Sequence, residues 1–212
     1  MTETINEIAQ AVQIGKVKLI KELVPKAIEE GNTAQEILNE GLLAGMSVIG
    51  DRFSRNEAFV PEVLVAARAM NKGTELIKPL LAAEGNEPIG KAVIGTVQGD
   101  LHDIGKNIVK LMIESKNIEI IDLGVDVSPE AFVEAVKNEN ADLVCCSALL
   151  TTTMPMIANV IEARKAAGLR DKVTVMVGGA PVTQEYADQI GADIYTEDGG
   201  AAANAAAAAL AK

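Results

Sequence analysis

The feature that most constrains the fold is a regular alternation of strand-like and helix-like segments, which begins at residue 92. The apolar, strand-like runs occupy residues 92–97, 118–122, 142–147, 172–177 and 192–195. A helix-like segment follows each run, and these segments occupy residues 105–116, 129–139, 154–167, 183–190 and 199–211. Repetition of this kind predicts a parallel sheet with helices on both faces. Five strands favour the flavodoxin-like order 2-1-3-4-5.

The preceding residues, 3–84, show helical spacing and no strand pattern. Thr33 followed three residues later by Glu36 is a capping box, and Pro61 suits the first turn of a helix. With the apolar residues that fall on one helical face, these signals predict helices over residues 5–12, 17–28, 33–48 and 61–81. Four helices joined by short loops predict a four-helix bundle.

The expected fold class is therefore α/β with two domains. Residues 1–88 form an N-terminal four-helix bundle, and residues 89–212 form a flavodoxin-like (Rossmann-like) domain with a five-stranded parallel sheet. Residues 82–91 are polar and contain Gly and Pro, so this stretch predicts a linker that serves as a hinge.

Composition argues against several function classes. The formal net charge is −11, whereas nucleic acids and anionic membranes are bound by basic patches. No apolar run approaches the roughly 18 residues of a membrane span, and the N-terminus lacks the basic and then apolar order of a signal peptide. A cytoplasmic protein is expected.

Cys145 and Cys146 are adjacent within a strand-like run, so both are expected to be reduced and packed as small hydrophobes.

The only histidine of the chain, His102, lies in the loop that follows the first strand-like run. In parallel α/β sheets ligands bind outside the carboxyl ends of the strands. Asp100 comes two residues earlier, close enough to hydrogen-bond the imidazole and set its tautomer. This arrangement is typical of a metal ligand or a general base.

Three further loops are expected at the same sheet edge. Residues 147–153, 178–181 and 196–200 are rich in glycine and small hydroxyl side chains. Glycine lets a ligand approach the backbone closely, and hydroxyls supply hydrogen bonds without bulk. The implied ligand is large and polar at one end. The first loop lacks both the G-x-G-x-x-G and the G-x-x-x-x-G-K-[ST] patterns, which argues against a dinucleotide or P-loop site.

Two other classes of protein share this topology. A phospho-aspartate receiver domain would want a lysine after the last strand, where this chain has Thr196-Glu197-Asp198. A flavodoxin-like electron carrier would need aromatic side chains to stack a flavin, and the second half offers Phe132, Tyr186 and Tyr195. The flavin alternative stays open from the residues alone.

Three motifs occur in order: Asp-x-His-x-x-Gly at residues 100–105, Ser-x-Leu at 147–149, and Gly-Gly at 178–179. In order and loop placement they resemble the cobalamin-binding domain of B12-dependent methyltransferases. Residues 45–53 and 59–64 look like the helical cap that accompanies this domain. The resemblance covers nearly the whole chain.

In that family the corrinoid is bound with its own lower base displaced, and a protein histidine takes the lower axial position on cobalt. The resemblance implies that His102 is this ligand, that Asp100 holds the other ring nitrogen, and that Ser147 bonds Asp100 to complete a relay. It also implies the following corrinoid-binding residues: Gly99, Asp100, Leu101, His102, Asp103, Ile104, Gly105, Ser147, Leu149, Thr151, Gly178, Gly179, Ala180, Thr196 and Gly199. Candidates to cover the upper face are Met46, Phe53, Phe59 and Val60, which could equally be ordinary bundle core.

Because the two domains stand alone, the chain is similar to the small corrinoid protein of three-component methyltransferase systems in anaerobic one-carbon metabolism. The resemblance implies a methyl carrier that turns over only with its partners. A substrate methyltransferase would load the methyl group on Co(I), giving methylcobalamin or a related methylcorrinoid. A second methyltransferase would pass it to tetrahydrofolate or coenzyme M, and a reductive activase would restore Co(I).

A methylamine or a quaternary amine such as betaine is the favoured methyl donor, and methanol or an aryl methyl ether is the alternative. A B12-dependent sensor is a further alternative function. Such a sensor would normally carry a DNA-binding or signalling domain, for which this acidic chain has no basic helix.

Overall fold

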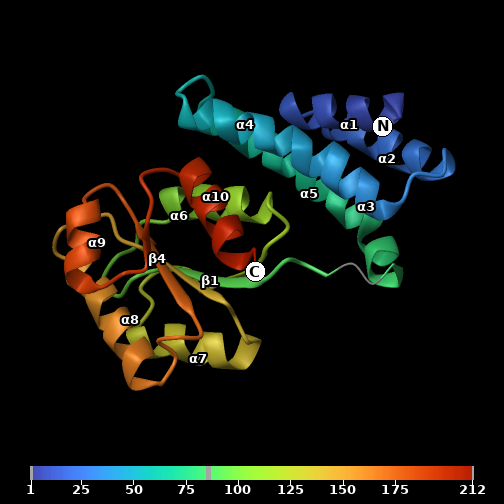
Figure 1. Ribbon diagram of the computed structural model, residues 1–212. Helices are drawn as coiled ribbons and strands as arrows, with labels where there is room; N and C mark the ends of the chain where they lie inside the picture. The colour runs from blue at the N-terminus through green and yellow to red at the C-terminus, as the bar shows by residue number, and fades with distance from the viewer. Residues whose placement is uncertain (1, 85–86, 212) are drawn as a thin grey trace. The chain divides into compact units, whose positions relative to one another are not determined.

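The computed structural model describes residues 2–84 and 87–211, which fall into two compact units, Met1–Glu87 and Pro88–Lys212 (Figure 1). The linker expected over residues 82–91 includes residues 85–86, which lie outside the described residues. Of its remaining residues, Ala83 ends the last helix of the first unit and Lys91 begins the first strand of the second. None of the described helices is both long enough and apolar enough to span a membrane.

The first unit is helical, as the sequence predicts. Its elements are α1 (Glu3–Gln13), α2 (Val17–Glu29), α3 (Ala34–Glu36), the π-helical segment η1 (Ile37–Leu43), α4 (Ala44–Ser54) and α5 (Val60–Ala83). The capping box before α3 is present: Glu36 N donates to Thr33 Oγ1 at 3.1 Å, and Thr33 N donates to the Glu36 carboxylate at 2.8 Å. The helix predicted over residues 33–48 is longer than expected, because η1 leads without a break into α4.

The second unit contains a parallel sheet. Its strands are β1 (Lys91–Thr96), β2 (Glu119–Asp122), β3 (Leu143–Ser147), β4 (Thr174–Gly178) and β5 (Ile194–Tyr195). All four strand pairs are parallel, and their order is β2-β1-β3-β4-β5. The predicted order is confirmed. All five carboxyl ends therefore lie at one edge of the sheet, and the loops that follow them meet there.

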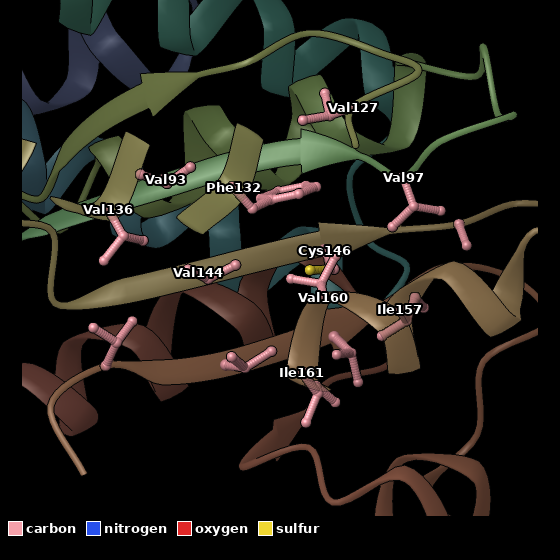
Figure 2. Close-up of a cluster of buried hydrophobic side chains, with 14 of the residues drawn as sticks. Val93, Val97, Val127, Phe132, Val136, Val144, Cys146, Ile157, Val160 and Ile161 are labelled. Atoms are coloured by element: carbon pink, nitrogen blue, oxygen red, sulfur yellow. The ribbon is translucent and has the colours of Figure 1, made fainter. Parts of the chain in front are cut away.

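Helices cover both faces of this sheet (Figure 1). They are α6 (Ile104–Glu114), α7 (Pro129–Glu139), α8 (Met154–Ala166), α9 (Gln184–Ile190) and α10 (Gly199–Leu210). Helices α6 and α10 pack together on one face, and α7 and α8 pack together on the other. Figure 2 shows the core beneath α7 and α8, where Phe132 and Ile157 meet Val93 and Val144 of the sheet. This packing fixes the strands whose ends carry the candidate site.

Candidate functional site

Asp100 is a fully buried carboxylate in the loop between β1 and α6, and it uses both of its oxygens. Asp100 Oδ1 lies 2.7 Å from His102 Nδ1 and accepts a 3.1 Å hydrogen bond from His102 N. Asp100 Oδ2 accepts hydrogen bonds from Leu149 N and Thr153 Oγ1, each at 2.8 Å. The predicted Asp100–His102 contact is therefore present. It is one of four polar contacts that the Asp100 carboxylate makes.

The charge of Asp100 decides the tautomer of His102. Burial by itself raises the pKa of Asp100, but hydrogen bonds from Leu149 N, His102 and Thr153 outweigh it and hold this pKa well below its ordinary value. An ionised carboxylate can only accept, so His102 Nδ1 carries the proton. In the neutral imidazole Nε2 then keeps its lone pair, and the side chain is 51% exposed. The imidazole is thus set to offer Nε2 to a metal from outside the protein.

The backbone of the His102 loop is also tied to the sheet. Thr96, at the end of β1, donates from Oγ1 to His102 O at 2.8 Å. Asp100 N donates to Val97 O at 3.1 Å, closing a tight turn in which Gly99 has a φ of +81°. Glycine adopts this left-handed conformation at no steric cost. The loop therefore presents His102 from a fixed base.

The four loops that the sequence predicts at one edge are in contact there. The first joins the loop after β3 through the Asp100–Leu149 hydrogen bond. The loop after β3 meets the end of β4 so closely that a Cβ on Gly179 would lie 1.9 Å from Ala148 O. A Cβ on Gly178 would lie 3.2 Å from Thr196 O in the loop after β5. The two glycines are needed because other backbone segments pass against them.

The predicted hydrogen bond from Ser147 to Asp100 is wrong. Among the described residues the hydroxyl that reaches Asp100 is that of Thr153, the residue before α8. Ser147 is still within β3, where it is the register partner of Thr96. Asp100 lies four residues beyond Thr96, so its carboxylate faces the loop that follows Ser147 and the start of α8. Ser147 remains at the sheet edge but outside the relay.

Other predicted positions differ in accessibility. Leu101, Asp103, Ile104, Gly105, Leu149, Thr151, Gly179 and Ala180 are exposed at the sheet edge. Gly199 is buried instead, because it begins α10 against α6, where a Cβ would lie 3.4 Å from the Met112 side chain. Gly199 therefore serves helix packing, and its surface is closed to a ligand in this structure.

In the helical unit the four cap candidates also differ. Met46 is fully buried, whereas Phe59 is 68% exposed, and Phe53 and Val60 are half-buried. Met46 thus has the surroundings of a core residue, and Phe59 is the candidate with most apolar surface to offer.

Two residues of the site have no clear signal in the sequence. Thr153 is the third of three consecutive threonines, and the sequence does not say which of them turns inward. Asp126, in the loop after β2, accepts a hydrogen bond from Gly99 N at 2.7 Å. Its only mark in the sequence is a position in a loop after a strand, and that loop carries none of the three motifs.

Known proteins share both units of this chain. Residues 90–207 match the B12 binding domain family, and residues 4–78 match a second family described as a B12 binding domain. The chain is 46% identical over 198 residues to the dimethylamine corrinoid protein of Methanosarcina barkeri, with 92% of each chain covered. The chain belongs to the B12-binding family.

This B12-binding protein is also 41% identical over 210 residues to the trimethylamine corrinoid protein of Methanosarcina barkeri, covering 98% of this chain and 97% of the other. Its structure superposes with a TM-score of 0.88 on a chain of the methanol:cobalamin methyltransferase complex of the same organism. That match has 31% sequence identity and covers 99% of this chain and 80% of the other.

The sheet edge of this B12-binding protein fits a corrinoid on three observations. The imidazole of His102 is 51% exposed, and its Nδ1 is taken up by Asp100, which leaves Nε2 to face a metal. In the same loop Leu101 and Ile104 are 71% and 72% exposed, and Leu149 is 43% exposed. A large macrocycle would remove this apolar surface from water. Beside them Gly105 faces open space, since nothing lies within 4 Å of an added Cβ.

Proposed function

We propose that this chain is a corrinoid-dependent methyl carrier of a methylamine methyltransferase system. The observation that carries the proposal is the hydrogen-bonded pair of His102 and ionised Asp100, placed at the carboxyl edge of a B12-binding domain. Similarity along 92% of the chain to a dimethylamine corrinoid protein supports the same conclusion. When bound, the corrinoid supplies a cobalt ion that accepts a methyl group from one protein partner and gives it up to another.

The residues of this chain act on that cobalt through one nitrogen. His102 Nε2 would hold the cobalt of the corrinoid, and the proton on Nδ1 would stay in the hydrogen bond to Asp100. Negative charge on Asp100 makes the imidazole a stronger donor, and the Leu149 and Thr153 hydrogen bonds keep that charge in place.

The partners follow from the same role. One is a methyltransferase that takes a methyl group from a methylamine, for which the similarity to dimethylamine and trimethylamine corrinoid proteins is the support. A second methyltransferase would deliver the group to tetrahydrofolate or coenzyme M, and a reductive activase would restore the reduced metal. We infer that these encounters take place in the cytoplasm.

The test uses the full chain loaded with hydroxocobalamin and reduced with titanium(III) citrate. Dimethylamine, trimethylamine, betaine and methanol are offered in turn, each with a methyltransferase that acts on it, and methylation of the bound cobalt is followed by absorbance. Methylation that requires both a methylamine and its methyltransferase is the expected result. A protein that binds cobalamin but is methylated in neither of the methylamine mixtures would contradict the proposal.

A further inference from the structure

Asp126 makes two hydrogen bonds to the backbone of the loop that contains Asp100. Its carboxylate Oδ1 accepts a 2.7 Å hydrogen bond from Gly99 N, one residue before Asp100. Its own backbone N donates to Asp100 O at 3.0 Å. One residue from the loop after β2 therefore holds the amide of Gly99 and the carbonyl of Asp100, the carboxylate partner of His102.

These two hydrogen bonds hold the backbone next to Asp100, whereas other residues hold its carboxylate. Leu149 N and Thr153 Oγ1 hold the carboxylate from the side of α8, as described above. Asp126 holds the main chain from the side of β2. Because the Asp100 side chain is short, a rotation of its backbone would swing Oδ1 away from His102 Nδ1. The direction of the imidazole thus depends on the two hydrogen bonds that Asp126 makes to this backbone.

The conformation of Asp126 points to a specific requirement at this position. Its φ is +55°, in the left-handed region that non-glycine residues seldom enter and that aspartate tolerates better than most. Glycine would adopt this φ more easily, but glycine has no acceptor for Gly99 N. The next residue, Val127, anchors the loop by donating from N to Thr96 O at 3.0 Å. Held left-handed conformations of this sort cluster at functional sites.

The Asp126 side chain is exposed, so an effect of Asp126 on the position of His102 can be measured apart from an effect on stability. A single exposed hydrogen bond contributes little to global stability, because water replaces it when the chain unfolds. Its loss should therefore leave the fold intact and change the orientation of His102.

We propose that Asp126 is a positioning residue for the axial imidazole: by holding Gly99 N and Asp100 O, it sets the direction in which His102 presents Nε2. This inference rests on the proposed function in taking His102 as the cobalt ligand. It adds a residue from the loop after β2, which carries none of the three motifs.

Three variants separate geometry from charge. Asp126→Gly keeps the freedom to adopt a positive φ but removes the acceptor. Asp126→Asn removes the negative charge but keeps a side-chain oxygen for Gly99 N and tolerates the same φ. Asp126→Ala loses the acceptor and disfavours the φ. Thermal unfolding of each apo-protein checks that the fold is kept, and Asp126→Asn is the matched control for lost charge.

The first readout needs no corrinoid. With ¹⁵N-labelled histidine the apo-protein gives a single imidazole spin system, since His102 is the only histidine. We expect the Nδ1-protonated tautomer in the unaltered protein and in Asp126→Asn, and a mixture of tautomers in Asp126→Gly and Asp126→Ala. Unaltered ring signals in Asp126→Gly would overturn the proposal.

The second readout is electron paramagnetic resonance of the full chain loaded with cob(II)alamin. The ratio of histidine-bound to histidine-free cobalt should fall about tenfold in Asp126→Gly, the lower end of what supporting groups contribute at metal sites, and recover in Asp126→Asn. An Asp126→Asn variant as defective as Asp126→Gly would mean that charge matters and position does not. If the apo-protein signals change as expected but the unaltered protein has no histidine nitrogen on cobalt, the proposed function fails while the positioning role stands.

Discussion

Thr153 and Asp100, 53 residues apart in the chain, are joined by a 2.8 Å hydrogen bond from Thr153 Oγ1 to Asp100 Oδ2. Thr153 lies at the start of α8, and its hydroxyl is buried with the carboxylate. The relay that begins at the exposed imidazole of His102 therefore ends in the protein interior at a threonine, six residues beyond the serine of the Ser-x-Leu motif.

Replacing Thr153 should weaken this relay, whereas replacing Ser147 should not. Thr153→Val keeps the shape of the side chain and removes the hydroxyl, so the unfolding free energy of the apo-protein should fall by about 1 kcal/mol. Cobalamin affinity should fall about tenfold, because Asp100 holds His102 less firmly. Thr153→Ser should keep both properties. Urea unfolding and a cobalamin titration measure the effects, and a larger loss in Ser147→Ala than in Thr153→Val contradicts the account.

Two glycines of the site should respond in opposite ways to alanine. In Gly179→Ala the new Cβ would lie 1.9 Å from Ala148 O at a φ of +131°, so we expect a loss of more than about 2 kcal/mol of stability. Gly105 is in α6 with nothing within 4 Å, and Gly105→Ala should leave the apo-protein as stable or up to about 1 kcal/mol more stable. Cobalamin binding should nevertheless weaken in Gly105→Ala, since the open space is where we place the ligand. Thermal unfolding without ligand and a cobalamin titration separate the two effects.

Exposed apolar side chains beside His102 should matter for binding and not for folding. Leu101 and Ile104 are 71% and 72% exposed, so Leu101→Ser and Ile104→Ser should leave the unfolding free energy within about 0.5 kcal/mol of the unaltered value. Each should raise the Kd for cobalamin about tenfold, the effect of losing about 1.5 kcal/mol of apolar burial. Ile14→Ser is the control, because Ile14 is 59% exposed in the helical unit. Equal Kd values for all three variants and the unaltered protein would place the ligand elsewhere.

Asp193 should make stability depend on pH through its ion pair with the buried side chain of Arg164. It accepts hydrogen bonds from Arg164, Arg170 and Val175 N, and the Arg164 side chain is only 2% exposed. Burial raises the pKa of Asp193, but the Val175, Arg170 and Arg164 contacts outweigh it and lower the pKa. Because the folded-state pKa is below the unfolded value of about 3.9, the contribution is complete above that pH and is lost as pH falls through the folded pKa.

Asp193→Asn should therefore cost about 3 kcal/mol at pH 7, since it leaves the Arg164 charge buried without its partner. The difference from the unaltered protein should shrink as the pH is lowered from about 5 to 2. Arg170 is the matched control, because its side chain is 49% exposed and Arg170→Ala should cost less than about 1 kcal/mol. Denaturant unfolding at several pH values tests this, and a gap that widens in acid would contradict the assigned pKa direction.

The sheet and its helices could be predicted because their signals are local or topological. Strands such as Leu143–Ser147 are buried on both faces and read as continuous apolar runs, and a right-handed crossover leaves few possible strand orders. The Thr33–Glu36 capping box involves residues three apart. The Asp100–His102 contact could be predicted for the same reason, since the two residues share one turn.

What could not be predicted depends on contacts between distant loops. Ser147 and Thr153 both offer a hydroxyl, and only the position of Asp100, four residues beyond the end of β1, selects Thr153. Asp126 reaches Gly99 because β1 and β2 are neighbours, but a single aspartate in a loop after a strand has no pattern that distinguishes it from a solvated one. The π-helical segment Ile37–Leu43 likewise has a sequence that reads as ordinary helix.

The most direct test of the central claim is the electron paramagnetic resonance spectrum of the full chain loaded with cob(II)alamin, compared with and without ¹⁵N-labelled histidine. His102 is the only histidine in 212 residues, so any histidine nitrogen on cobalt belongs to it. We predict cobalt lines split into triplets by ¹⁴N in the unlabelled protein and into doublets in the labelled one. A splitting that labelling leaves unaltered would show that another nitrogen holds the metal and that His102 is not its ligand.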